Sequence, residues 1–262
     1  MTTRRTAGAW GLALVTALAP ATGAADDWDR ATSSDDGITT GNVLLHGSEQ
    51  VHDLGALGVG DQDWYFVLAR QYSSYEVRVD GMNGDLDLTA TDVQRLNEEG
   101  TQVLQNALVT DTGGVLSLTW THGPGVGIGN LIRIHSPTCA PSCPGTRATY
   151  RVRYFDTTYT VPRFENSDAQ QTTLIVQNAT DRTCQVSYTF FDAAATVLHA
   201  AAPKSLPARF LDVFRTSIVV PGAAGSIRIA HTCGYGGLSG KAVTLEPSTG
   251  FVFETDLEHR PH

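Results

Sequence analysis

The sequence lacks the motifs by which several classes of enzyme are recognised. It contains no His-Glu-x-x-His zinc-protease motif, no Gly-x-Ser-x-Gly nucleophile elbow and no Asp-x-Asp-x-Asp-Gly calcium loop. It also lacks a membrane span, because its longest apolar run, residues 7–19, falls well short of the roughly 20 residues needed to cross a bilayer. These absences favour a non-enzymatic protein without a membrane anchor.

Basic residues are scarce relative to acidic ones. The 262 residues include 18 Lys and Arg against 27 Asp and Glu, a formal net charge of −9. Residues 26–156 hold 18 acidic and 8 basic residues, whereas residues 157–262 hold 9 and 8. Nucleic acid and anionic membranes bind positive charge, so neither is an expected partner. A divalent cation or a basic partner is compatible with this balance.

The first 25 residues have the pattern of a secretory signal peptide. Arg4 and Arg5 precede the apolar run, and the small residues 23–25 suit cleavage before Asp26. We therefore expect a secreted protein, extracellular or periplasmic after processing.

The chain has four cysteines, and an even number in an exported chain suggests disulfides. Cys139 and Cys143 have no second Cys or His pair at zinc spacing nearby, so we expect a local bridge. Cys184 and Cys233 each share strand parity with apolar residues. We expect both sulfurs to point into one core and to form a bridge between sheets. Two free core thiols are the alternative.

Almost every periodic segment shows the two-residue alternation of β-strands, punctuated by Gly and Pro. Only segments 92–99 and 192–202 are plausible helices, and neither has an amphipathic stripe. In the second half, eight candidate strands span 159–164, 172–178, 184–191, 195–200, 210–214, 226–231, 242–245 and 251–254. We predict an all-β fold with two consecutive antiparallel β-sandwich domains, over residues 26–156 and 157–262. The strand count predicts that the second is immunoglobulin-like.

A known family is suggested by the order and spacing of several segments in the first half. The segments are Gly-Asp-Gln-Asp-Trp-Tyr-Phe (60–66), an alternating strand (75–79), Gly-Asp-Leu-Asp-Leu (84–88), Ile-Arg-Ile (132–134) and Tyr-Arg-Val-Arg-Tyr (150–154). Through these segments, roughly residues 40–156 resemble the bacterial pre-peptidase C-terminal domain. The resemblance implies a jelly-roll-like β-sandwich that serves as an accessory, secretion-linked or substrate-contacting module.

The end of the chain suggests less. Segments 237–243 and 249–253 resemble the end of other exported bacterial β-sandwich proteins of unassigned function, and this similarity implies no particular activity.

Four aspartates of the first half form a candidate cation site. Asp61 and Asp63 are two residues apart, as are Asp85 and Asp87, so each pair projects from one face of an extended chain. If the two segments are neighbours, their carboxylates converge, and calcium, which some relatives of the module bind, would neutralise them. The alternative is that these aspartates cap turns by accepting hydrogen bonds from backbone N–H groups.

Two further patterns keep other functions open. Asp111-Thr-Gly resembles the catalytic tripeptide of aspartic peptidases, although that chemistry needs two aspartates and a hairpin turn explains the same residues. A set of tyrosines could include a platform for stacking sugars: Tyr72, Tyr75, Tyr150, Tyr154 and Tyr159.

We therefore expect a secreted, non-enzymatic binding or structural accessory protein whose partner is an extracellular protein or polysaccharide. One alternative is a peptidase-like hydrolase whose site is assembled only in three dimensions. The other is a calcium-stabilised adhesion module.

Overall fold

The structure, a computed structural model of the 262-residue chain, describes residues 35, 37–54, 62–82, 91–109, 114–125, 127–136, 148–167 and 169–259. The predicted signal peptide, the predicted Cys139–Cys143 bridge and the Asp111 tripeptide lie outside these residues. The described residues form antiparallel strands and one 3₁₀ turn, η3 (Thr216–Ile218), with no α-helix among them. The prediction of an all-β sandwich fold is confirmed.

The first half of the chain forms a sandwich of two antiparallel sheets. One sheet has the strand order β1-β9-β3-β7-β6, and the other has the order β2-β8-β4-β5. Their bounds are β1 (Glu49–Leu54), β2 (Gln62–Leu68), β3 (Ser73–Gly81), β4 (Asp92–Leu96), β5 (Val103–Asn106), β6 (Leu108–Val109), β7 (Val115–His122), β8 (Gly129–His135) and β9 (Ala148–Asp156).

Alternation along these strands separates the core from the outer faces. In β3, the inward residues Tyr75, Val77 and Val79 are at most 2% exposed and belong to the main apolar cluster. Removing such side chains from water stabilises a fold by roughly 25 cal/mol per Å² of apolar surface. The outward residues of β3 include Glu76 and Arg78, which become important at the contact with the second half.

The second half forms another sandwich. One sheet has the order β13-β12-β16-β10-β19, with β14 also paired to β12, and the other has the order β15-β11-β17-β18. Their bounds are β10 (Tyr159–Glu165), β11 (Gln171–Asn178), β12 (Cys184–Phe191), β13 (Val197–Ala200), β14 (Lys204–Leu206), β15 (Leu211–Arg215), β16 (Ala224–His231), β17 (Leu238–Glu246), β18 (Phe251–Asp256) and β19 (Glu258–His259).

All eight candidate strands of this half are present, with ends shifted by a few residues. The two segments considered as helices are strands instead, since β4 lies in 92–99 and β13 lies in 192–202.

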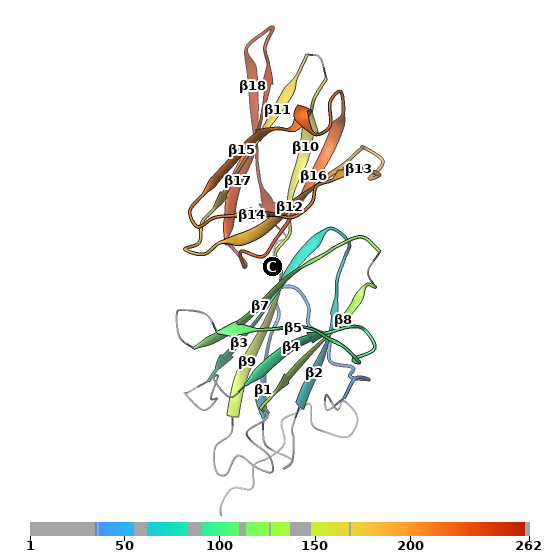
Figure 1. The fold of residues 1–262 in the computed structure, drawn as a ribbon, viewed down its shortest axis with the longest axis vertical. Coiled ribbons are helices and arrows are strands. Elements are labelled where there is room, and N and C mark those ends of the chain that lie inside the picture. The colour runs from blue at the N-terminus through green and yellow to red at the C-terminus, as the bar shows by residue number, and fades with distance from the viewer. Residues whose placement is uncertain are drawn as a thin grey trace, which may run out of the picture.

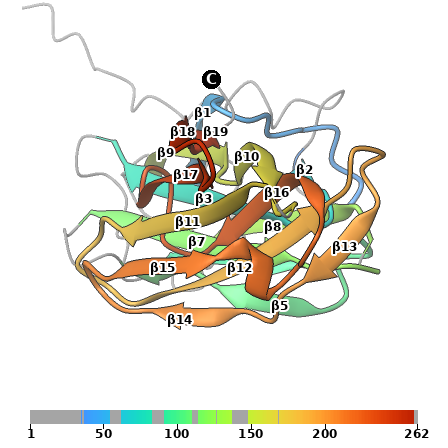
Figure 2. The same cartoon turned by 90° about the horizontal axis from the view of Figure 1, so that it is seen from above.

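The two sandwiches are stacked along the long axis of the molecule (Figure 1). Strand β9 of the first leads into β10 of the second through Thr157 and Thr158, so the two apolar clusters lie on either side of this connection. Seen from above, the sheets of the second half cover those of the first (Figure 2). The part of the chain that the structure describes contains no candidate membrane-spanning helix.

The Cys184–Cys233 disulfide is present, as predicted. Its predicted placement between sheets is wrong, because β12 and β16 are neighbours in one sheet. The pair Val186 and His231 is in register, and Cys184 and Cys233 continue that ladder by one further inward position. Strand parity gives the direction of a side chain but does not distinguish an adjacent strand from an opposite one. A disulfide is typical of proteins from oxidising compartments.

We expect the disulfide to be a major source of stability for the second sandwich. The bridge closes a loop with a sequence separation of 49 residues, for which loop-closure entropy predicts a stabilisation of about 4 kcal/mol. The double variant Cys184→Ala/Cys233→Ala should unfold at lower urea concentration by a comparable amount. Added reductant should weaken the wild type more than the variant, which keeps only Cys139 and Cys143. Equal midpoints for both chains would contradict this prediction.

Candidate functional site

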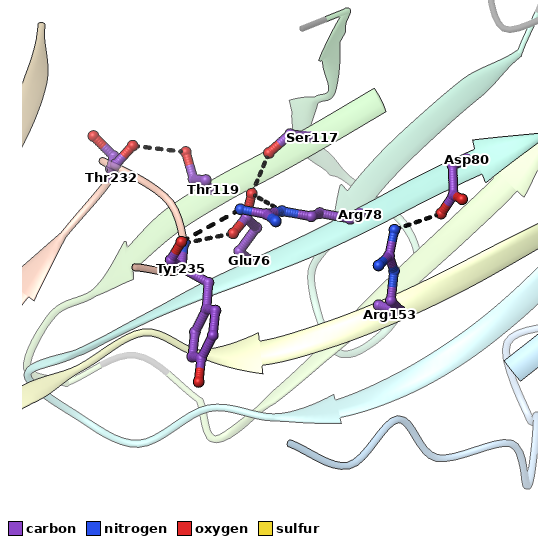
Figure 3. A network of polar contacts seen from close by, with 8 residues as sticks. All are labelled: Glu76, Arg78, Asp80, Ser117, Thr119, Arg153, Thr232 and Tyr235. Atoms are coloured by element: carbon purple, nitrogen blue, oxygen red, sulfur yellow. Dashed lines mark hydrogen bonds and ion pairs between the residues drawn. The ribbon is translucent and has the colours of Figure 1, made fainter. Parts of the chain in front are cut away.

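The two sandwiches meet through the buried carboxylate of Glu76 on β3. One oxygen accepts hydrogen bonds from Arg78 Nε at 2.8 Å and Ser117 Oγ at 2.7 Å. The other accepts one from the backbone N–H of Tyr235, in the second sandwich, at 2.7 Å (Figure 3). The side chain of Glu76 is only 3% exposed. Three donors, one of them charged, offset the cost of taking a carboxylate out of water.

The loop that carries Tyr235 is shaped to reach Glu76. It follows β16, and Gly234 and Gly236 adopt φ of 83° and 73°, left-handed values that favour glycine. The ring of Tyr235 stacks on Phe155 with centroids 4.6 Å apart. Arg78 also packs on Phe155, with its guanidinium carbon 5.5 Å from the centroid of that ring. The contact therefore combines polar and aromatic packing.

A buried histidine supports the same contact. His231 Nε2 donates to the carbonyl of Thr157 at 2.7 Å, and the N–H of Cys233 donates to Nδ1 at 3.1 Å. These partners select the neutral Nε2–H tautomer. Burial lowers the pKa of His231 to about 4, although the Thr157 carbonyl and the charge of Glu76 act in the opposite direction. Protonation would turn Nδ1 into a second donor facing an N–H group.

Beside this contact lie two adjoining hollows, which we call the aromatic hollow and the acidic hollow. The aromatic hollow has a volume of about 360 Å³ and is lined by Arg70, Gln71, Tyr72, Thr160, Phe191, Ala195, Val197, Ser226, Ile227 and Arg228. The acidic hollow has a volume of about 320 Å³ and is lined by Arg70, Ser73, Asp156, Thr158, Thr160, Arg228, Glu258 and His259. They share three residues and draw on both sandwiches, so together they form one cleft at the domain contact.

Only one of the five tyrosines considered as a sugar platform lines the cleft. Tyr72 is half-buried and borders the aromatic hollow. The other four are core residues with at most 8% exposure: Tyr75, Tyr150, Tyr154 and Tyr159. The platform hypothesis therefore reduces to Tyr72.

The predicted cation site falls only partly within the described residues. Asp63 lies in β2, is fully buried and accepts a hydrogen bond from the hydroxyl of Tyr150. Asp61, Asp85 and Asp87 lie outside the described residues, so their convergence with Asp63 stays a prediction.

The structure places two other potential ligands next to Asp63. Asp35 and His52 are both fully buried, and the ligand atoms of all three residues lie within 4.8 Å of one another. Asp35 Oδ2 is 3.2 Å from His52 Nδ1. His52 Nε2 lies 3.1 Å from the amide oxygen of Gln50, which fixes Nε2 as a donor and turns Nδ1 toward Asp35. This geometry suits either an imidazolium–carboxylate pair or a metal ligand with a hydrogen-bonded second nitrogen.

Local chemistry is consistent with negative charge in this cluster. Tyr150 is completely buried, and burial together with the adjacent Asp63 raises its pKa well above the usual value. Its hydroxyl therefore stays protonated and donates to Asp63, while the hydroxyl of Tyr65 lies 2.6 Å away.

Sequence reasoning did not identify Asp35, His52, Arg70 or Arg228. His52 lies on the same face of β1 as the buried Leu54, and this alternation could have placed His52 in the core. No local signal pairs it with Asp35, because the two meet only through tertiary structure. The two arginines of the cleft likewise come from different sandwiches.

Comparisons with known proteins give architecture only. No protein-family model matches the chain, and no curated protein matches it. Among solved structures, the chain is similar to the pre-peptidase C-terminal domain of collagenase from Bacillus anthracis, with 11% identity, a TM-score of 0.32, and coverage of 43% of this chain and 92% of that chain.

Two other structures are similar over most of the chain. The N-terminal CBM22-1–CBM22-2 tandem of Xyn10C from Paenibacillus barcinonensis has 11% identity, a TM-score of 0.21, and coverage of 84% of this chain and 99% of that chain. The full extracellular region of zebrafish Gpr126/Adgrg6 has 13% identity and a TM-score of 0.25, with coverage of 82% of this chain but 31% of that chain. Such low scores reflect shared β-sandwich architecture and carry no argument about ligand or activity.

We expect acid to weaken the domain contact through His231. The pKa of His231 is about 4 in the folded protein, against about 6.5 for a histidine in the unfolded chain. Between these values the unfolded chain binds a proton that the folded chain does not, so stability falls as pH falls. The loss should begin near pH 6.5 and reach about 3 kcal/mol by pH 4. Urea unfolding across this range should show a smaller acid loss in His231→Gln, which keeps a donor but does not titrate. Identical pH profiles would refute this role.

Proposed function

We propose that this protein is a secreted, non-catalytic binding protein that contacts an extracellular polymer at the cleft between its two sandwiches. The observation that carries the proposal is the composite cleft, whose aromatic and acidic hollows share Arg70, Thr160 and Arg228. A binding cleft built from two domains is a common place for ligands. The Cys184–Cys233 disulfide supports an exported location.

The lack of catalytic motifs in the sequence supports binding without turnover. The acidic first half and its resemblance to an accessory module support the same role. Because polysaccharide and protein partners both offer many weak contacts, the intact domain arrangement should matter for affinity.

A binding panel tests this proposal with the full processed chain. Immobilised neutral and acidic polysaccharides and extracellular matrix proteins are the probes, and released sugar or peptide is measured in parallel. We expect saturable binding to at least one probe without release of products. The variant Glu76→Ala should weaken that binding, because it removes the acceptor of the Tyr235 N–H hydrogen bond between the domains, together with the two hydrogen bonds from Arg78 and Ser117 that hold this carboxylate in place. Turnover, or no binding to any probe, would overturn the proposal.

A cation-stabilised first sandwich is a second candidate, favoured by the buried Asp35–His52–Asp63 cluster. Two carboxylates and an imidazole fit the donor preferences of zinc better than those of calcium, which takes oxygen ligands. A bound ion would neutralise the buried carboxylates and hold β1 and β2 together.

Thermal melting tests this second candidate. After chelation, zinc should raise the midpoint more than calcium does, because the cluster includes an imidazole nitrogen. A ligand present at 100 times its dissociation constant adds about 2.7 kcal/mol to the stability of the folded state. Asp35→Asn should remove the response, whereas Asp181→Asn, an exposed change in the second sandwich, should preserve it. If neither zinc nor calcium changes the thermal midpoint, the cluster is an imidazolium–carboxylate pair and not a metal site.

A further inference from the structure

We propose that the cleft recognises the carboxylates of an acidic, uronate-containing polysaccharide through Arg70 and Arg228. This inference rests on the proposed binding function and adds the chemical class of the ligand. Its basis is that the two arginines line both hollows, one from each sandwich, in a chain with an excess of negative charge.

Neither guanidinium is committed to a carboxylate within the described part of the chain. Most other cations there have such a partner, as Arg151 and Arg153 do with Asp80. Arg70 is exposed and makes no ion pair with a described residue. Two such charges in one cleft favour an anionic ligand.

Arg228 is held in position without being neutralised. Its Nη1 donates to the backbone carbonyl of Gln71, in the other sandwich, at 2.9 Å. Its guanidinium carbon lies 4.9 Å from the ring centroid of Phe191. A guanidinium has five N–H donors, so this anchoring leaves donors for a ligand. A planar carboxylate accepts a pair of parallel hydrogen bonds from such a fork.

Acceptors in the acidic hollow distinguish a uronate from a ligand with dense negative charge. Asp156, Glu258 and Thr160 all line this hollow. Carboxylates repel a phosphate or sulfate cluster but accept hydrogen bonds from sugar hydroxyls. A uronate unit combines one carboxylate with several hydroxyls, which matches arginines next to acidic acceptors.

Backbone strain also singles out this cleft. Three non-glycine residues have positive φ in the described residues, and Tyr72 and Ala195, with φ of 58° and 61°, both line the aromatic hollow. A bulky residue in the left-handed region costs of the order of 1 kcal/mol or more. The ring of Tyr72 packs edge-on against Phe191, with centroids 5.9 Å apart, while it borders the hollow, so a sugar face can stack on a ring that is already held in place.

The experiment measures binding of the full processed chain to polygalacturonate and to the same polymer after carboxyl reduction. We expect binding to the acidic polymer, loss on reduction, and weakening at high salt. Arg70→Gln should weaken binding about tenfold or more, and Arg228→Gln should act in the same direction. Arg215→Gln, which removes an exposed positive charge on β15 outside the cleft, should leave affinity within about twofold.

The variant Tyr72→Asn tests the contribution of the Tyr72 ring to binding separately from its contribution to folding. Asparagine tolerates the left-handed backbone, which offsets part of the packing lost where the ring meets Phe191 edge-on at a centroid distance of 5.9 Å. The variant should therefore lower the thermal midpoint only slightly while binding the acidic polymer less tightly. Unchanged affinity would remove Tyr72 from the site.

The remaining outcomes separate this inference from the broader function. The uronate assignment is overturned if the chain binds a neutral polymer or a matrix protein with an affinity that neither Arg70→Gln nor Arg228→Gln changes. The proposed binding function would then still hold. Equal affinity for polyglutamate also overturns the uronate assignment, in favour of an acidic peptide. An equal effect of Arg215→Gln would reveal non-specific charge attraction. Binding to none of the probes overturns both proposals.

Discussion

The buried carboxylate of Glu76 is the contact on which the arrangement of the two sandwiches depends. Its three donors come from Arg78 on the same strand, Ser117 on the neighbouring strand, and the backbone of Tyr235 in the other sandwich. A carboxylate in such a place is costly unless all its neighbours stay in position. The contact therefore selects one orientation of the domains, and the cleft beside it inherits its shape from that orientation.

Strands were predictable where burial is one-sided, since alternation then appears in the sequence. The two strands missed in the second half, β14 and β19, have three and two residues, too few to show a period. In segment 92–99, where a helix was plausible from the sequence, both faces of β4 are covered. Val93 packs in the main core, whereas Leu96 packs with Trp64 on the outer side of the sheet. Their spacing of three residues is also the spacing of a helix.

The candidate sites were less predictable than the strands that carry them. Parity placed the side chains of Cys184 and Cys233 correctly, but it holds no information on which strands are neighbours. In the same way, inward parity could have located His52 in the core without identifying Asp35 as its neighbour. Which residues meet is fixed by the pairing of strands within a sheet and by the packing of sheets against each other. Both depend on contacts between distant parts of the chain.

The Cys184–Cys233 bridge has a consequence for how the two domains come together. Cys233 lies at the start of the loop that presents the Tyr235 N–H to Glu76. Once the bridge has formed, that loop samples fewer conformations before it meets the first sandwich, so less entropy is lost on docking. The disulfide thus preorganises one partner of an intramolecular association.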